Sequence, residues 1–171
     1  KHLSRAADGR PGRLAFAYEE AVGTCPAPEI VADKDGITTA LLMAAWEAEL
    51  KAAGVTLQDE LDALYRRHGY FASTQVAVRT TNPRELVDAW STTPPDELIG
   101  VSMDSSALPE NQGVVIKGRL GAIQLRVICR VSGTEAKAKI YLEVAQASSH
   151  AEASELLEKL QEEVHSWGRK L

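Results

Sequence analysis

Two segments of alternating apolar residues, separated by a short polar stretch, constrain the fold of this chain more than any other feature. The segments are AIQLRVICR at positions 122–130 and KIYLEVA at positions 139–145. The residues that share one face are Ile123, Leu125, Val127 and Cys129 in the first and Ile140, Leu142 and Val144 in the second. Such alternation is typical of strands with one buried face. The segments therefore predict an antiparallel pair whose apolar side covers a core.

The first part of the chain has the pattern of a strand followed by two helices. The segment GRLAFAYEEAVG at positions 12–23 alternates and predicts a strand that runs into a loop. Asp35-Gly36 indicates a turn, and helical spacing of apolar residues, Trp46 among them, continues to Gly54. A second helix at positions 55–69 begins with a capping pattern at Thr56. We expect these two helices to pack together, with Trp46 in the core.

The second part predicts a small domain with a sheet and helices. Asn82 and Pro83 indicate the start of a short helix, and positions 96–112 are expected to be irregular, with a strand near GVVIKG at 113–118. The last helix begins near Ser149 and carries an apolar stripe that includes Trp167. The predicted fold class is α/β plus α+β. We expect an incomplete α/β layer in residues 1–70 and, in residues 71–171, a small α+β domain with an antiparallel sheet backed by the last helix.

Composition excludes several classes of function. The net charge of −5 and the isoelectric point of about 5.4 argue against nucleic acid as a partner. Apolar runs are too short to span a membrane, so no membrane partner is expected. Cys25 and Cys129 have no disulfide or metal spacing, which favours a reduced, cytoplasmic setting and no metal site in this chain.

The polar stretch between the two alternating segments has the chemistry of an anion site. Its sequence is RVSGTEAK, and the candidate phosphate-binding residues are Arg130, Ser132, Gly133, Thr134 and Lys137. Successive amides around a glycine form a concave donor set, hydroxyls add donors, and a guanidinium matches two phosphate oxygens. A solvated hairpin tip without a ligand is the alternative that these residues leave open.

Three segments in this order resemble the α-D-phosphohexomutases, the phosphoglucomutase and phosphomannomutase superfamily. RVSGTEAKAKIYLEV resembles the phosphate-binding loop of that family, usually written RPSGTEPK. FAYEEAVG at positions 16–23 resembles the sugar-recognition loop, and DKDGITTALL at 33–42 resembles the segment that follows it. Val131 and Ala136 replace the two prolines of the family pattern, which leaves the loop less rigid without removing a ligand group.

The resemblance implies that this chain is a C-terminal fragment. Residues 1–70 would be part of domain 3, the second half of an α/β/α domain. Residues 71–171 would be domain 4, a TATA-box-binding-protein-like antiparallel four-stranded sheet packed by helices. The sequence has neither the aspartate-rich Mg²⁺ loop nor the serine motif of the family. We therefore expect no catalytic or metal residue here and an inactive fragment. The complete enzyme is expected to use Mg²⁺ and a sugar bisphosphate activator, and to interconvert sugar 1-phosphate and 6-phosphate through a phosphoserine. The expected partners are the sugar phosphate substrate and the N-terminal domains.

Sugar recognition is assigned by resemblance to Glu19, Glu20 and Lys34. Glu19 matches the carboxylate that binds ring hydroxyls, whereas Glu20 has the alternative of pairing with an arginine, and Lys34 that of a solvated turn lysine. Ala21 stands where hexose-specific members often have serine, so a phosphopentomutase of the same superfamily is one alternative function. A stand-alone phosphate-binding or interaction module without catalysis is the other.

Overall fold

The computed structural model describes residues 6–9, 11–19, 23–133 and 135–168, and the chain divides into two compact units. Unit 1 is Lys1–Asp62 and unit 2 is Ala63–Leu171. The division falls inside helix α2 (Leu57–His68), a few residues before the boundary predicted near Gly69. The assignment of the units to two enzyme domains stays a prediction.

Unit 1 begins with a short two-stranded hairpin. Strand β1 (Ala17–Glu19) pairs antiparallel with β2 (Gly23–Cys25). The predicted strand is therefore confirmed only at its end. The face that carries Phe16 and Tyr18 is exposed, whereas Ala17 and Cys25 are buried. The short strand covers too little surface to bury both of its faces.

Helix α1 (Gly36–Ala52) starts at the Asp35-Gly36 pair, which the sequence predicted to be a turn. The Asp35 carboxylate accepts hydrogen bonds from the backbone N–H groups of Ile37 at 3.0 Å and Thr38 at 3.1 Å. It is therefore an N-cap, which satisfies donors that have no partner within the first helical turn. Thr56 and Asp59 form the predicted reciprocal capping box of α2.

The predicted burial of the two helices is wrong. Neither α1 nor α2 has a buried residue, and Trp46 is 39% exposed rather than part of a core. The largest apolar side chains that these helices expose are Ile37, Leu41, Leu42, Met43, Trp46, Leu61 and Leu64. Helical spacing predicts which side chains share a face, but it does not predict whether another element covers that face.

Unit 2 contains a six-stranded antiparallel sheet in the order β3-β8-β7-β6-β5-β4. Its strands are β3 (Tyr70–Arg79), β4 (Glu97–Leu98), β5 (Val101–Ala107), β6 (Gly113–Leu120), β7 (Ile123–Val131) and β8 (Lys137–Ala147). The predicted antiparallel pair is β7 and β8, with Val127 opposite Leu142. The alternation of apolar residues thus correctly predicts the centre of the sheet.

The sheet has two strands more than the four that were predicted. Strands β4 and β5 lie in the region expected to be irregular, followed by a 3-10 helix, η2 (Pro109–Asn111). The sequence of β5, VSMDSSA, buries only Val101 and Met103, because its second half is exposed on both faces. A strand with so few buried side chains has almost no periodic signal, and pairing with β6 determines its conformation.

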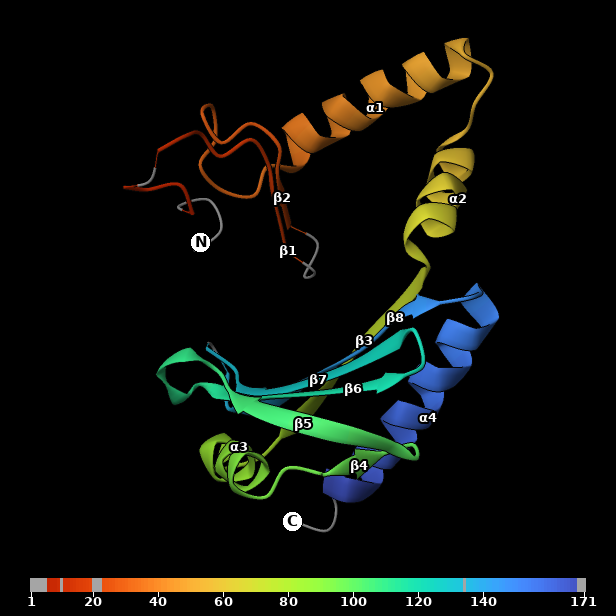
Figure 1. The fold of residues 1–171 in the computed structure, drawn as a ribbon. Coiled ribbons are helices and arrows are strands. Elements are labelled where there is room, and N and C mark those ends of the chain that lie inside the picture. Colours follow the sequence, from red (N-terminus) through yellow and green to blue (C-terminus); the bar gives the residue numbers. More distant parts are fainter. Residues whose placement is uncertain (1–5, 10, 20–22, 134, 169–171) are drawn as a thin grey trace. The chain divides into compact units, whose positions relative to one another are not determined.

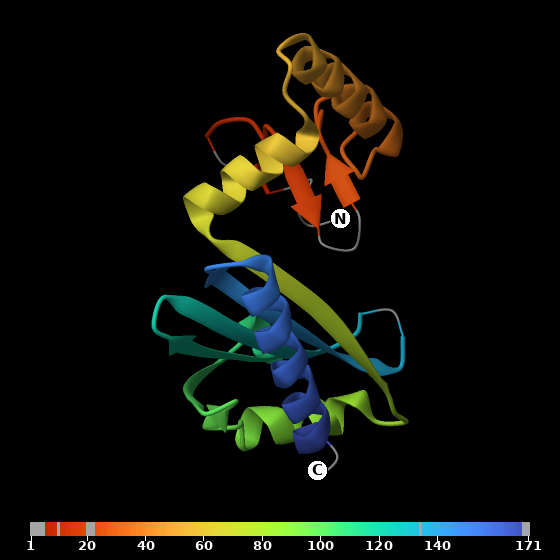
Figure 2. The same ribbon diagram turned by 90° about the vertical axis from the view of Figure 1, so that its right-hand side faces the viewer.

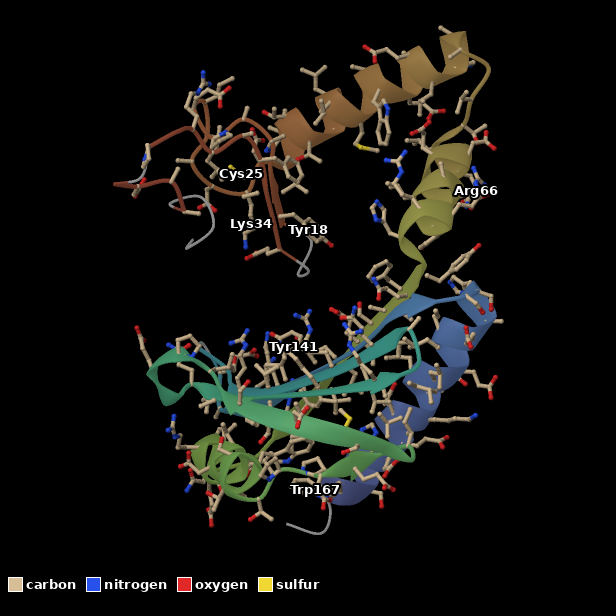
Figure 3. All side chains as sticks on the ribbon, in the orientation of Figure 1. Tyr18, Cys25, Lys34, Arg66, Tyr141 and Trp167 are labelled. Carbon is tan, nitrogen blue, oxygen red and sulfur yellow. The ribbon has the colours of Figure 1, made fainter. Side chains whose placement is uncertain are left out.

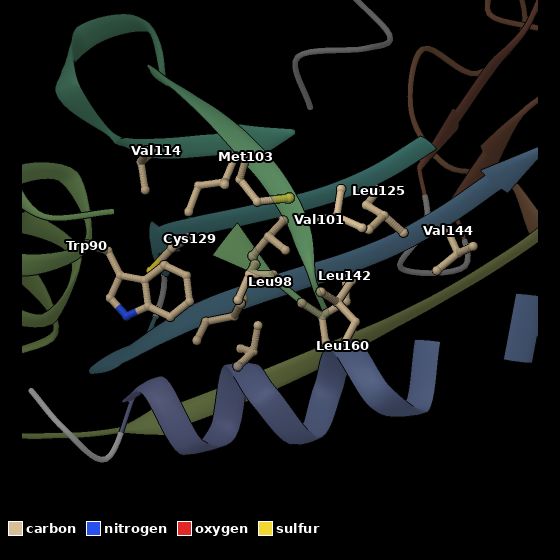
Figure 4. Close-up of a cluster of buried hydrophobic side chains, with 14 of the residues drawn as sticks. Trp90, Leu98, Val101, Met103, Val114, Leu125, Cys129, Leu142, Val144 and Leu160 are labelled. Carbon is tan, nitrogen blue, oxygen red and sulfur yellow. The ribbon is translucent and has the colours of Figure 1, made fainter. Parts of the chain in front are cut away.

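Helices α3 (Pro83–Thr92) and α4 (His150–Gly168) pack on the same face of the sheet and leave the other face open (Figures 1 and 2). Their N-termini are capped as predicted, with Asn82 accepting from the Glu85 N–H and Ser149 from the Glu152 N–H. Between helices and sheet lies the core shown in Figure 4, in which Trp90 and Leu160 are fully buried. Trp167 packs edge-on against Trp90, as its position on an apolar stripe predicted.

Candidate functional site

The loop between β7 and β8 is closed by backbone hydrogen bonds. The Ser132 N–H donates to the Lys137 carbonyl at 2.9 Å, and the Lys137 N–H donates to the Glu135 carbonyl at 2.8 Å. Ser132 is the one buried polar residue of the described chain. The Ser132 N–H is therefore already used inside the loop, and the predicted phosphate contact of Ser132 stays a prediction. Thr134 lies outside the described residues.

Gly133 occupies an open position of this loop. Apart from its two chain neighbours, a Cβ added at Gly133 would meet no atom within 4 Å. Its backbone therefore lies free of neighbouring side chains, where a ligand has access to it. The predicted contribution of Gly133 to phosphate binding stays a prediction, and this open position is consistent with it.

The guanidinium of Arg130 is held at the end of β7 by two hydrogen bonds. Its Nη2 donates to the Tyr141 hydroxyl oxygen at 2.7 Å, and its Nη1 donates to the Val131 carbonyl at 3.3 Å. The guanidinium carbon also lies 5.2 Å from the centre of the Tyr141 ring, within the range of a cation–π contact. These contacts fix the plane of the guanidinium and leave its remaining N–H groups for a ligand.

Lys137, at the start of β8, forms an ion pair with Glu135 inside the loop. The side chain of Lys137 is only 16% exposed, whereas that of Glu135 is 55% exposed. The hydrogen bond from Lys137 lowers the pKa of Glu135, and the nearby charges of Arg79 and Lys139 lower it further. Glu135 therefore stays ionised and partly neutralises a strongly cationic hairpin tip.

Cations lie directly opposite one another at this end of the sheet. Arg130 on β7 pairs with Lys139 on β8, and Lys137 on β8 pairs with Arg79 on β3. Like charges in directly opposite positions of a sheet destabilise it. A bound anion would remove this repulsion. We call the four residues Arg79, Arg130, Lys137 and Lys139 the tip cluster.

Tyr141 connects the tip cluster to the open face of the sheet. Alternation along β8 places Lys137, Lys139, Tyr141 and Glu143 on the face opposite the buried Ile140 and Leu142. Figure 3 shows Tyr141 on the open side of the sheet and Trp167 on the helix side. Sequence analysis did not include Tyr141, Arg79 or Lys139 in the site. The period of two along β8 was the signal that could have found Tyr141 and Lys139.

Unit 1 brings two predicted sugar-binding residues into contact. The Lys34 Nζ donates to the Glu19 Oε1 at 2.6 Å, and this bond is the largest cause of the lowered pKa of Glu19. Figure 3 marks Lys34 in the segment beside β2. The Asp35 N–H donates to the Thr24 carbonyl at 2.9 Å and thereby holds this segment against β2. Glu20 and Ala21 lie outside the described residues, so the prediction for Glu20 is not assessed by this structure.

Gly23 makes the contact between Glu19 and Lys34 sterically possible. It stands opposite Glu19 in the hairpin, and a Cβ added to it would lie 2.2 Å from the Lys34 Cδ and 2.7 Å from the Glu19 Cγ. The lysine side chain therefore lies across the hairpin where any other residue would block it. Sequence analysis missed this role of Gly23, which depends on the register of β1 and β2.

The described residues contain no group of three or more His, Cys, Asp and Glu side chains that could hold a metal ion. Nor does any helix in the described part of the chain have the length and apolar character needed to cross a bilayer. The functional groups that the structure brings together are thus a cationic tip in unit 2 and a carboxylate–ammonium pair in unit 1.

Comparison with known proteins gives three informative similarities. A probable phosphomannomutase of Haemophilus influenzae is 31% identical over 163 residues, which cover 91% of this chain and 33% of that protein. A phosphoglucomutase of Staphylococcus epidermidis is 28% identical over 155 residues, 76% of this chain and 28% of that protein. A phosphopentomutase of Mus musculus is 36% identical over 61 residues, 36% of this chain and 10% of that protein. No family model matches the chain. The chain spans about a third of the length of the first relative it matches.

Proposed function

Because this chain belongs to the phosphohexomutase superfamily, we propose that it supplies the substrate-binding part of an enzyme that interconverts sugar 1-phosphates and 6-phosphates. In this proposal unit 1 belongs to domain 3 and recognises the sugar, and unit 2 is the TATA-box-binding-protein-like domain 4 and binds the phosphate that is not being transferred. In this proposal the four strands of that domain would be β3, β8, β7 and β6 of the six-stranded sheet.

The reaction that this proposal implies consists of two phosphoryl transfers. The O–P bond of a phosphoserine breaks and an O–P bond to the sugar forms, which gives a sugar bisphosphate. The bisphosphate then reorients and returns its other phosphate to the serine. In this proposal phosphoserine and Mg²⁺ would be held by other domains of the enzyme, which carry the serine motif and the aspartate-rich loop of the family. No step proposed for this chain passes through the metal.

The tip cluster is the observation that carries the proposal. It combines opposed like charges with an arginine whose guanidinium is oriented by Tyr141 before any ligand binds. A preoriented guanidinium loses less side-chain entropy when it binds a phosphate through two parallel hydrogen bonds. When the tip cluster binds the phosphate that does not react, the binding energy gained there positions the reacting end of the sugar.

In unit 1, the Glu19–Lys34 pair is proposed to contact the sugar. The carboxylate accepts from ring hydroxyls, and the ammonium donates to a ring or phosphate oxygen. The pair is accessible, with side-chain exposures of 33% for Glu19 and 53% for Lys34. The alternative of a solvated turn lysine is less favoured now, because Lys34 is hydrogen-bonded to the carboxylate that the family resemblance assigned to the sugar.

Replacing Arg130 is the main test of the proposed function. In the complete enzyme we expect Arg130→Ala to raise the KM for the sugar phosphate strongly and to lower kcat as well, because positioning is lost. Isothermal titration of the 171-residue chain with glucose 6-phosphate would measure the binding loss directly. The matched control is Arg84→Ala on α3, whose guanidinium pairs with Asp88 on the helix side of unit 2. Equal affinities of Arg130→Ala and the unmodified chain would contradict the proposal.

Replacing Tyr141 tests whether orientation of Arg130 matters. Tyr141→Phe keeps the ring beside the guanidinium but removes the hydroxyl acceptor, so we expect an affinity loss of about threefold to tenfold, typical of one hydrogen bond. The double variant Tyr141→Phe/Arg130→Ala should then bind no more weakly than Arg130→Ala alone, because Tyr141 acts through Arg130. If the double variant instead lost as much affinity as the two single variants together, Tyr141 would contribute to binding independently of Arg130.

The mouse phosphopentomutase similarity favours a second candidate substrate, a pentose phosphate. It covers 36% of this chain, whereas the phosphomannomutase similarity covers 91%. A panel of glucose, mannose, glucosamine and ribose monophosphates, tested with the complete enzyme, would distinguish the candidates. A kcat/KM for ribose phosphate above that for every hexose phosphate would replace the hexose assignment.

A further inference from the structure

The open face of the sheet in unit 2 consists of rows of side chains that cross the strands. The tip cluster contains the first row, in which Arg130 lies opposite Lys139. Next comes an apolar middle row of Val115, Ile128 and Tyr141 on β6, β7 and β8. Beyond it lies a charged far row of Asp104, Lys117, Arg126 and Glu143 on β5 to β8. All three rows point away from the helices, because their neighbours along each strand are buried.

A hollow of about 600 Å³ lies over the far row. Its lining includes Lys117, Arg126 and Glu143 from that row, and Arg119 from the next row, two positions further along β6. Arg126 forms an ion pair with Glu143, with 2.5 Å between Nη2 and Oε2. Lys117 and Arg119 have no ion-pair partner among residues 6–9, 11–19, 23–133 and 135–168. The hollow therefore offers two uncommitted cations, with the Asp104 carboxylate opposite Lys117.

Charges in unit 2 are segregated between the two sides of the sheet. The helix side carries the acidic residues of α4, namely Glu152, Glu155, Glu158, Glu162 and Glu163. Two described cations on that side, Arg84 and Lys159, are each paired with an acid one helical turn away. On the open face, by contrast, Lys117 and Arg119 have no ion-pair partner among the described residues. Such an arrangement raises the local concentration of anions at the open face even though the whole chain is acidic.

The spacing of the rows matches a molecule with a phosphate at each end. Residues on one face of a strand repeat every two positions, so adjacent rows are about 6.6 Å apart and the tip and far rows about 13 Å apart. Arg130 extends over the middle row, because its Nη2 donates to the Tyr141 hydroxyl, whereas Arg126 pairs with Glu143 in its own row. The half-buried side chains of Tyr141 and Ile128 offer an apolar surface between the two rows of cations.

We propose that the hollow lined by Lys117, Arg119 and Arg126 is a second phosphate site, which holds the distal phosphate of a sugar bisphosphate whose first phosphate is on Arg130. The inference rests on the proposed function for the identity of the ligand. Its role follows from the two-transfer reaction, in which the bisphosphate must not dissociate before it has returned a phosphate to the serine. A second site retains the bisphosphate more than either monophosphate, because only the bisphosphate reaches both.

The test compares a monophosphate with a bisphosphate on variants that change the net charge equally. The probes are glucose 6-phosphate and glucose 1,6-bisphosphate, titrated calorimetrically into the 171-residue chain at low salt. The variant is Lys117→Gln/Arg119→Gln on the open face, and the matched control is Arg84→Gln/Lys159→Gln on the helix side. All four side chains are exposed, so the fold is expected to tolerate both double substitutions.

We expect the open-face variant to have an affinity for the bisphosphate that is about tenfold lower, because charge-assisted hydrogen bonds to a phosphate are lost. Its affinity for the monophosphate should change by less than about twofold. The affinities of the control variant for both ligands should also change by less than about twofold. In the complete enzyme, the open-face variant should also need more added bisphosphate to sustain turnover, because the intermediate escapes more often.

Three results would overturn the second site. One is an unmodified chain that binds the bisphosphate no more tightly than the monophosphate. The second is an open-face variant whose affinities for both ligands fall equally, which would indicate a diffuse charge effect. The third is an open-face variant whose affinity for neither ligand falls. Failure of the proposed function looks different: Arg130→Gln would then leave the affinity for both ligands unchanged, whatever the ratio between them.

Discussion

The two units of this chain differ in how they hold their functional groups. In unit 2, the tip cluster stands on β3, β7 and β8, whose inner faces pack against α3 and α4. In unit 1, the Glu19–Lys34 pair stands on strands of three residues, and α1 has no buried residue. Arg130 is thus supported by a core, whereas Lys34 is supported mainly by hydrogen bonds to Glu19 and from the neighbouring Asp35 to Thr24.

This difference implies that the two units respond differently to substitution. A packed core transmits the loss of a side chain to the whole unit, because its neighbours cannot relax fully into the space. A site supported by a few surface hydrogen bonds loses function locally, and the rest of its unit is little affected. The apolar side chains of α1 also indicate that unit 1 has a surface suited to packing against another protein element.

The largest expected difference is between the two tryptophans. Trp90→Ala in unit 2 should lower the free energy of unfolding by about 3–5 kcal/mol, because Trp90 is fully buried against Trp167. Trp46→Ala in unit 1 should cost less than about 1 kcal/mol, because that side chain is 39% exposed. Native-state hydrogen exchange measures the two units separately. Equal losses in both units would refute the contrast drawn between them.

A glycine pair gives the next largest contrast. Gly113 has a φ of +154°, and a Cβ there would lie 2.1 Å from the Cys129 carbonyl oxygen, so Gly113→Ala should destabilise unit 2 by about 2–3 kcal/mol. At Gly23 the obstructing atoms belong to the flexible side chains of Lys34 and Glu19, which can move away. Gly23→Ala should therefore cost less than about 1 kcal/mol while breaking the Glu19–Lys34 pair.

Hydrogen exchange of each unit, together with the NMR titration of the Glu19 carboxylate, would check both glycine substitutions. The expected result for Gly23→Ala is a Glu19 pKa that returns toward its ordinary value in a unit that is still folded. An unchanged pKa would mean that Lys34 reaches Glu19 by another path, and that Gly23 is not needed for the contact.

The smallest expected effects concern the pKa values of two carboxylates. Hydrogen bonds from Lys34 and Lys137 lower the pKa of Glu19 and Glu135 respectively. Each pair therefore contributes to stability above the pKa of the unfolded state, and this contribution disappears as the pH falls through the folded-state pKa. Lys34→Ala should abolish most of the lowering of the Glu19 pKa. Lys137→Ala should leave the Glu135 pKa partly lowered, because the charges of Arg79 and Lys139 still act on it.

Carboxylate chemical shifts measured across the acidic pH range would test this difference. The control is Lys159→Ala, which removes a comparable pair on α4 and should leave both carboxylates unchanged. If Glu135 lost its whole shift with Lys137, the cations of the tip cluster would not act together on an anion. That result would weaken the electrostatic argument for phosphate binding as well.

Sequence was most informative where local patterns and tertiary packing agree. The alternation in β7 and β8 and the caps at Asn82 and Ser149 depend on neighbouring residues, and the structure confirms them. Burial of Trp46 and the existence of β5 depend on which distant element packs or pairs with each segment. That dependence is invisible in a periodic pattern, so those two predictions failed.

The residue types of the candidate site were predictable from the sequence, but the hydrogen bonds and charge contacts between them were not. Arg130 and Lys137 could be named from the loop sequence, and Glu19 and Lys34 from the family resemblance. The bond that occupies the Ser132 amide and the acceptor role of Tyr141 could not, because both require the register of β7 against β8. Opposed cations likewise become visible only when the strands are aligned.

Arg126 and Arg130 are four residues apart on β7, an even interval that places both arginines on the same face of the sheet. Inserting one residue between them would turn one of the two arginines toward the core and bring a buried neighbour such as Val127 out to water. Only paired insertions would keep both cations outside. Variation in length is therefore tolerated in the hairpin loop beyond Val131, whereas the interval along the strand is fixed by geometry rather than by the ligand.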